Sequence, residues 1–157
     1  MFNEKQRQDY EDQAVDVVKD VYTHIKDNVT FTVPTDKYNH WDMVATTNDK
    51  VYYLENKTRN VSYKLYKDEG YYLDANKVDG TIDLFNFYFP QDNILMITTY
   101  DKIKDLVPQD TLINRSIYCD DESQPTEKKN IVIPYIRFWV YDTESYNLIN
   151  KPIKLEI

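Results

Sequence analysis

Two short apolar runs joined by three turn-forming residues constrain the fold of this 157-residue chain more than any other feature. The runs cover residues 39–46 and 50–58, and the Thr, Asn and Asp at residues 47–49 all tolerate turn conformations. A β-hairpin is therefore predicted here. Because side chains alternate between the two faces of a strand, Glu55 and Lys57 are expected to point to the same side of it.

An amphipathic helix is predicted before this hairpin. Residues 3–26 contain no Gly or Pro, and apolar side chains such as Val15, Val18 and Tyr22 recur at helical spacing. Glu11 falls on the same stripe, since steps of four, three and four residues stay on one helical face. Glu11 therefore either points toward the edge of the core or complements the helix dipole near the N-terminus.

Similar patterns predict the remaining elements. They are a short strand over residues 29–33, a helix over 71–78, strands over 81–89 and 93–100, a helical turn over 101–106, a mobile loop over 119–130, an apolar strand over 131–141 and an edge strand over 153–157. Together they predict one α/β domain over residues 1–157, with a central mixed β-sheet flanked by helices. An exposed edge strand also offers main-chain groups to a second copy, so a homodimer is one expectation.

Composition restricts the metals that the chain can bind. Cys119 is the only cysteine, and His24 and His40 are the only histidines. These counts exclude an internal disulfide and a zinc site built from nitrogen and sulfur ligands. Any metal ion bound by this chain would be held mainly by oxygen atoms.

The N-terminal segment is not expected to be a signal peptide. The first 26 residues are charged throughout, and no apolar run reaches the ~18 residues that a bilayer crossing needs. We therefore expect a soluble, cytoplasmic protein. The 15 Tyr and 2 Gly residues fit an AT-rich coding sequence, as in some bacteria and their phages, so the expected compartment is a bacterial cell or a phage-infected host.

The overall charge disfavours one class of partner. The formal net charge is -8, whereas binding to nucleic acid is normally driven by Lys and Arg side chains that displace condensed counterions. Five basic residues nevertheless lie close together in sequence, namely Lys57, Arg59, Lys64, Lys67 and Lys77. Local charge matters more than the total, so a basic rim beside an acidic site is compatible with this sequence.

The hairpin brings together residues that suit phosphodiester hydrolysis. Asp42 lies in its first run and Glu55 in its second, and side chains on adjacent antiparallel strands approach within a few ångströms. Mg²⁺ prefers such carboxylate oxygens, and hydrolysis needs a hard cation to polarise the phosphate. Lys57 would orient the attacking water, lower its pKa or stabilise the transition state. Glu11 is a candidate further ligand, and Lys77 a candidate phosphate contact.

The order of helix, strand with Asp, turn and strand with Glu-x-Lys resembles the PD-(D/E)XK phosphodiesterase superfamily, also called restriction-endonuclease-like. The resemblance spans residues 11–84, about half of the chain. In that family an acidic residue begins one central strand and an acid-x-Lys triplet lies on the next. Here Asp42, preceded by His-Trp instead of Pro, matches the first, and Glu55-Asn-Lys57 matches the triplet. The segment that carries Lys77 is similar to the helix that follows the triplet in many members.

This resemblance implies a restriction-endonuclease-like fold and a Mg²⁺- or Mn²⁺-dependent nuclease, with DNA as the expected substrate. The expected site residues are Asp42, Glu55 and Lys57 for catalysis, Asp42, Glu55 and Glu11 for the metal ion, and Lys77 and Arg59 for the substrate. Two alternatives stay open. Glu55 and Lys57 can form an ordinary surface salt bridge, and the same fold occurs in proteins without activity. The chain would then be an inert binding or structural module, such as a phage accessory or virion-associated protein.

Overall fold

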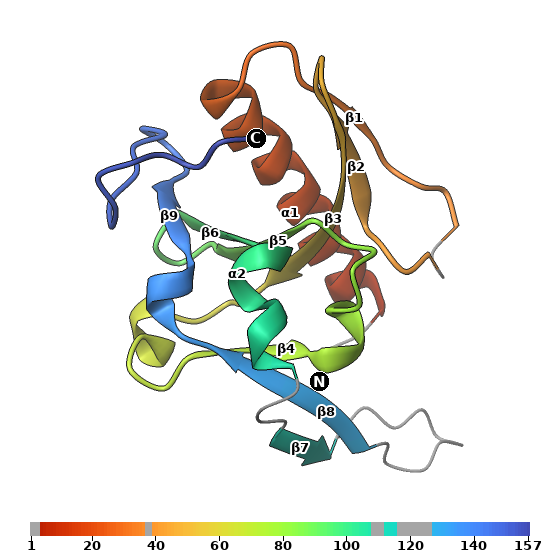
Figure 1. The fold of residues 1–157 in the computed structure, drawn as a ribbon, viewed down its shortest axis with the longest axis vertical. Coiled ribbons are helices and arrows are strands. Elements are labelled where there is room, and N and C mark those ends of the chain that lie inside the picture. The colour runs from red at the N-terminus through yellow and green to blue at the C-terminus, as the bar shows by residue number, and fades with distance from the viewer. Residues whose placement is uncertain (1–3, 37–38, 108–111, 116–126) are drawn as a thin grey trace.

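A six-stranded β-sheet forms the centre of the computed structural model, which describes residues 4–36, 39–107, 112–115 and 127–157 (Figure 1). Across the sheet the strands follow the order β1 (Thr30–Thr32), β2 (Met43–Thr46), β3 (Val51–Thr58), β5 (Leu84–Phe89), β6 (Ile94–Thr99) and β9 (Trp139–Asp142). Strands β3 and β5 are parallel, and the other neighbouring pairs are antiparallel. This central mixed sheet, with a long helix on one face, confirms the predicted α/β class.

The predicted hairpin is formed by β2 and β3. Thr46 pairs with Val51 at the turn, and Met43 pairs with Leu54 at the open end. The Thr47 hydroxyl accepts a hydrogen bond of 3.2 Å from the backbone N–H of Lys50, which stabilises the turn locally. This hairpin fixes which residues of β3 face each side of the sheet.

Helix α1 (Glu4–Ile25) covers one face of the sheet, and it confirms the helix predicted over residues 3–26. Its buried stripe packs on the even-numbered side of β3 and β5, in a cluster that includes Val18, Val21 and Tyr22 of the helix with Leu54 and Leu84 of the strands. Helical spacing places the three helix residues on one side, as the sequence periodicity requires. In the part of the chain that the structure describes, no helix has the length and apolar character needed to cross a membrane.

A second, three-stranded sheet covers part of the opposite face and lies along the lower edge of the view in Figure 1. Its strands follow the order β4 (Tyr71–Asp74), β8 (Glu127–Ile133) and β7 (Leu112–Arg115), all antiparallel. The core on this side contains odd-numbered residues of β5 and the inward residues of β4 and β8, namely Phe85, Phe87, Phe89, Tyr71, Leu73, Ile131 and Ile133. Strand β5 is therefore buried on both faces.

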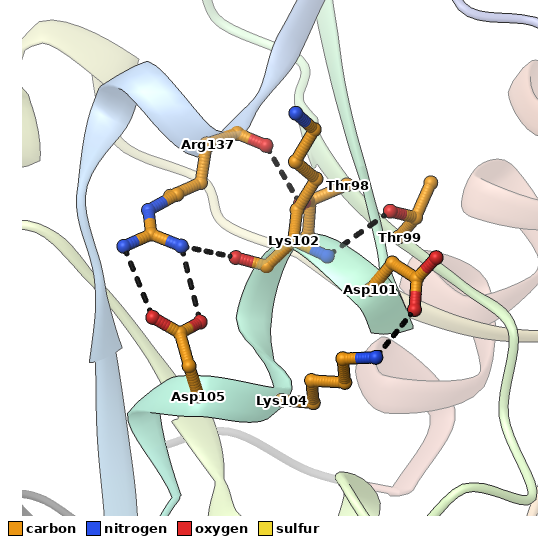
Figure 2. A network of polar contacts seen from close by, with 7 residues as sticks. All are labelled: Thr98, Thr99, Asp101, Lys102, Lys104, Asp105 and Arg137. Carbon is orange, nitrogen blue, oxygen red and sulfur yellow. Dashed lines mark hydrogen bonds and ion pairs between the residues drawn. The ribbon is translucent and has the colours of Figure 1, made fainter.

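Short helical turns connect these strands. They are η1 (Tyr63–Tyr66), η2 (Ala75–Lys77), α2 (Tyr100–Ile103), η3 (Lys104–Leu106) and η4 (Tyr135–Arg137). Figure 2 shows how Arg137 ties η4 to the α2–η3 segment. Its Nη1 and Nη2 donate to the two carboxylate oxygens of Asp105 at 3.1 and 3.3 Å, and Nη1 also donates to the carbonyl oxygen of Lys102 at 2.7 Å. This forked contact holds the turn that precedes β9.

The helix predicted over residues 71–78 is wrong. The segment forms strand β4 followed by the short turn η2. Tyr71 and Leu73 are buried in alternation and pair with Ile133 and Ile131 of β8. A partner strand far away in the sequence therefore decides the conformation, because four residues are too few for helical and strand periodicities to differ.

Two predictions near the C-terminus are also wrong. Residues 131–141 do not form one strand, because Pro134 has no N–H for a ladder and the chain leaves β8 there, turns through η4 and resumes as β9. Residues 153–157 do not form an edge strand, and Leu155 is buried against the first sheet instead. Of the loop predicted over 119–130, residues 119–126 lie outside the described part, and residues 127–130 belong to β8.

Candidate active site

The side chain of Glu55 is the centre of the candidate site, and only 2% of its surface is exposed. Leu54, the preceding residue, faces α1, so strand alternation turns Glu55 and Lys57 to the opposite side. Lys57 Nζ lies 3.2 Å from Glu55 Oε2, which confirms that the two side chains share a face. Lys77 Nζ approaches the other oxygen, Oε1, at 3.4 Å. The buried carboxylate is thus flanked by two ammonium groups.

Asp42 lies directly before β2. Its N–H donates to the carbonyl oxygen of Leu54 at 2.8 Å, and its Oδ2 accepts from the backbone N–H of Asn56 at 2.7 Å. This geometry places the Asp42 carboxyl beside that of Glu55. Burial raises the pKa of Asp42 to about 7; the nearby Glu55 carboxylate contributes to this increase, and the N–H of Asn56 opposes it. The nearby Glu55 carboxylate therefore disfavours the charged form of Asp42.

Lys77 joins the site from the turn that follows β4. The side chain of Asp74 caps this turn by accepting from the N–H of Asn76 at 2.9 Å. Lys77 Nζ donates to the carbonyl oxygen of His40 at 2.6 Å, and His40 Nε2 lies 3.2 Å from Asp79 Oδ2. These contacts connect the segment before β2 to η2, so Lys77 reaches Glu55 although the predicted helix around it does not form.

Glu11 is not brought together with the other two acids. It is exposed on α1, and α1 packs on the face of β3 opposite to Glu55. Across residues 4–36, 39–107, 112–115 and 127–157, no group of three or more His, Cys, Asp or Glu side chains is arranged to hold a metal ion. The structure therefore places Asp42 and Glu55 together without a third acidic ligand from α1.

Arg59 lies just beyond the end of β3. Its N–H donates to the carbonyl oxygen of Tyr88 at 2.8 Å, and its Nη1 donates to that of Thr58 at 3.3 Å. By strand alternation it follows Glu55 and Lys57 along the same side. It lines a small pocket on that side together with Phe87 of β5.

A buried polar chain links α1 to the site, and it was not predicted from the sequence. Tyr22 donates through its hydroxyl to Asn86 Oδ1 at 2.6 Å, and Asn86 Nδ2 donates to Asn56 Oδ1 at 3.0 Å. The same Asn56 holds Asp42 through its backbone N–H. The one signal in the sequence is that Asn86 stands inside the otherwise apolar and aromatic run of β5. The middle residue of the Glu55-Asn56-Lys57 triplet is thereby fixed from the helix side.

The donors at this site fit a hard divalent cation. Among the described residues, Glu55 Oε1 accepts no hydrogen bond of good geometry, although it lies at ion-pair distance from Lys77. A buried carboxylate oxygen without such a donor, next to a second carboxyl, is the environment that a cation stabilises. Oxygen donors of this kind match Mg²⁺ and Mn²⁺.

Comparison with known proteins found a similar backbone fold in a solved structure. No family model and no curated protein matches the sequence. Among solved structures, the chain is similar to a bacterial homing endonuclease, I-Ssp6803I, with a TM-score of 0.47 and 13% sequence identity. The match covers 80% of this chain and 83% of that chain.

Proposed function

We propose that this chain is a metal-dependent nuclease that hydrolyses phosphodiester bonds, with DNA as its substrate. One observation carries the proposal: the buried carboxylate of Glu55 lies between Lys57 and Lys77 and beside the carboxyl of Asp42. Two adjacent acids can hold a metal ion, and the two nearby ammonium groups can stabilise negative charge that develops on a phosphate. The order along the chain of helix, Asp42, hairpin turn and Glu55-Asn56-Lys57 also supports a restriction-endonuclease-like arrangement.

Asp42 and Glu55 are the residues that would hold Mg²⁺ or Mn²⁺. When bound, the ion would polarise the phosphate and make a water molecule more acidic. Asp42 is fixed for this role by Asn56, and Glu55 by its two lysine partners. Burial and, after it, the nearby Glu55 carboxylate raise the pKa of Asp42, and positive charge placed between the two carboxyls would counteract both.

Lys57 and Lys77 have complementary roles in this proposal. Both ammonium groups contact the buried Glu55, yet their side chains keep 31% and 22% of their surface exposed. Each can therefore turn one N–H toward a phosphate oxygen while another stays on the carboxylate. Lys57, beside the two acids, would orient the attacking water or stabilise the developing negative charge. Lys77 and Arg59 would contact the substrate phosphates.

One competing interpretation has an observation of its own. Each oxygen of Glu55 has a lysine ammonium within 3.4 Å, as in a structural ion-pair network that needs no metal ion. The chain would then be an inert binding or structural module. Measurement of metal binding separates the two interpretations, because a purely structural ion-pair network would not bind a divalent cation in place of a lysine.

Cleavage assays test the proposal. The purified chain is incubated with labelled single- and double-stranded DNA and RNA in Mg²⁺, Mn²⁺ or EDTA. We expect metal-dependent cleavage that Glu55→Gln abolishes and that Glu69→Gln, which removes an exposed acid, leaves intact. Absence of cleavage on every substrate, together with absence of metal binding by calorimetry, would contradict the proposal.

A further inference from the structure

A pocket of about 150 Å³ lies beside the candidate active site. Its lining residues are Arg59, Tyr66, Tyr71, Tyr72 and Phe87. Phe87 is the direct neighbour of Lys57 across the parallel β3–β5 pair. Arg59 follows Lys57 by two residues, which corresponds to roughly 7 Å along a strand. The pocket therefore continues the row of Glu55 and Lys57 on the same side of the sheet.

The three tyrosines of the pocket differ in their surroundings. Tyr71 is buried, donates through its hydroxyl to the carbonyl oxygen of Tyr63 at 2.7 Å and packs edge-on against Phe87, so core packing explains it. Tyr66 and Tyr72 are only partly buried. Their ring centroids are 6.5 Å apart and their planes meet at 89°. A flat molecule stacked on one ring would meet the other edge-on, which aromatic pairs favour.

Gly70 sets the conformation of the turn that connects Tyr66 to β4. Gly70 has a φ of 99°, a conformation that other residues rarely adopt. A Cβ atom added there would lie 2.4 Å from Val132 Cγ1 of β8. Gly70 N–H also donates to the carbonyl oxygen of Tyr66 at 2.7 Å. The close approach of this turn to β8 therefore holds Tyr66 and Tyr72 beside each other.

The volume and lining of the pocket suit one aromatic ring. A cavity of about 150 Å³ accepts a molecule the size of benzene. Tyrosine rings and an arginine guanidinium are the groups on which unpaired bases stack in proteins that bind single strands. A base within a duplex keeps both faces stacked and its edge paired, so it cannot enter.

From these observations we infer that the pocket binds a single unpaired pyrimidine base of a single-stranded nucleic acid, next to the phosphate contacted by Lys57. This inference rests on the proposed function and narrows its substrate to strands with unpaired bases. Tyr66 and Tyr72 supply the stacking surface, and Arg59 supplies a planar cation at the side nearest to Lys57.

Fluorescence anisotropy tests this inference on the full chain. A fluorescein-labelled oligo-dT strand is titrated with protein in EDTA at low ionic strength, so that no turnover occurs. We expect tighter binding of oligo-dT than of oligo-dA or of a duplex of the same length. Tyr72→Ala should weaken binding of oligo-dT on the order of 10-fold, and Tyr66→Ala should act in the same direction. Tyr72→Phe, which keeps the ring, should bind like the wild type.

The matched control is Tyr52→Ala. Tyr52 is partly buried, as Tyr66 and Tyr72 are, and Lys50 Nζ lies 4.9 Å from its ring centroid. By strand alternation, Tyr52 points to the face of β3 opposite to Glu55 and Lys57. It should leave binding of oligo-dT unchanged. Thermal unfolding of each variant shows whether it is folded, and Tyr66→Ala in the short turn η1 stands in if Tyr72→Ala in β4 does not fold.

The outcomes separate this inference from the proposed function. Equal affinity for oligo-dT and duplex, or unchanged binding in both alanine variants, would overturn the pocket assignment even if the protein cleaves duplex DNA. Equal affinity for oligo-dT and oligo-dA would overturn its restriction to a pyrimidine. If Tyr72→Ala weakens binding of oligo-dT and the wild-type chain cleaves no substrate, the pocket assignment is supported and the proposed nuclease is contradicted.

Discussion

The Oδ2 atom of Asp42 accepts a 2.7 Å hydrogen bond from the backbone N–H of Asn56, and this contact joins the two halves of the candidate site. Asn56 is the residue between Glu55 and Lys57, so the backbone of this triplet positions the Asp42 carboxyl. Any change that moves Asn56 therefore acts on the metal ligands and on Lys57 together.

The raised pKa of Asp42 predicts a specific effect of pH on stability. The pKa of Asp42 is about 7 in the folded chain, whereas the unperturbed value of an aspartate, which applies to the unfolded chain, is 3.8. Folding therefore favours the neutral acid. This contribution is complete below pH 3.8 and is lost as the pH rises through about 7. Asp42→Asn stays neutral and keeps an oxygen for the N–H of Asn56. In urea titrations with EDTA, its stability relative to the wild type should increase from pH 4 to 7 and then level off. A pH-independent difference would contradict this.

Metal binding should release a proton from the same group. A cation at Asp42 and Glu55 requires the charged form of Asp42, so below pH 7 binding should release about one proton per ion. Calorimetric titration with Mn²⁺ in two buffers of different ionisation enthalpy measures this number. Affinity should rise with pH up to about 7, and Asp42→Asn should remove both effects. Proton release that persists in Asp42→Asn would assign it to another group.

The buried polar chain from α1 should contribute to stability. Tyr22→Phe removes the hydroxyl that donates to Asn86 Oδ1 and leaves this buried acceptor unpaired. The free energy of unfolding should fall by about 1–3 kcal/mol, measured by urea denaturation. Tyr146→Phe removes an exposed hydroxyl that donates to Asp20, and it should change stability by less than ~0.5 kcal/mol. Equal effects of the two substitutions would show that these buried hydrogen bonds stabilise the fold no more than an exposed one does.

The two glycines offer a comparison of close packing with backbone conformation. Gly70 and Gly80 have similar φ values of 99° and 95°. An added Cβ at Gly70 meets Val132 Cγ1 at 2.4 Å, whereas at Gly80 the nearest atom, Tyr100 Oη, is 3.8 Å away. Gly70→Ala should therefore lower the free energy of unfolding by about 1–3 kcal/mol more than Gly80→Ala. If Gly80→Ala is the more destabilising in thermal and urea unfolding, the packing argument fails.

The sequence predicted the parts of the site that depend on local order. The β2–β3 hairpin follows from residues 39–58, and strand alternation then places Glu55 and Lys57 together. Lys77 and Glu11 show the limit of this reasoning. Lys77 reaches Glu55 from a turn instead of the predicted helix, and Glu11 is on a helix that covers the other face. Which face a helix covers is decided by tertiary packing, not by the helix pattern alone.

Longer-range contacts explain the other differences. Tyr71 and Leu73 become a strand because β8 is there to pair with them. Leu155 fits the alternation of an edge strand, yet its N–H donates to the Tyr141 hydroxyl at 3.2 Å and its side chain is buried in the core beside α1. The link from Tyr22 to Asn86 spans 64 residues, so no local pattern contains it.

The most direct test of the central claim compares Lys57→Ala with Lys104→Ala. Lys57 contacts the buried Glu55, whereas Lys104 pairs with the exposed Asp101, which is not one of the site residues, so both variants lose one charge. Single-turnover cleavage of labelled DNA is measured in Mn²⁺, and Mn²⁺ affinity is measured by calorimetry. We predict that Lys57→Ala still binds Mn²⁺ but cleaves at least ~100-fold more slowly, while Lys104→Ala behaves like the wild type. Equal cleavage rates in the two variants, or no cleavage by the wild type, would contradict the proposed nuclease.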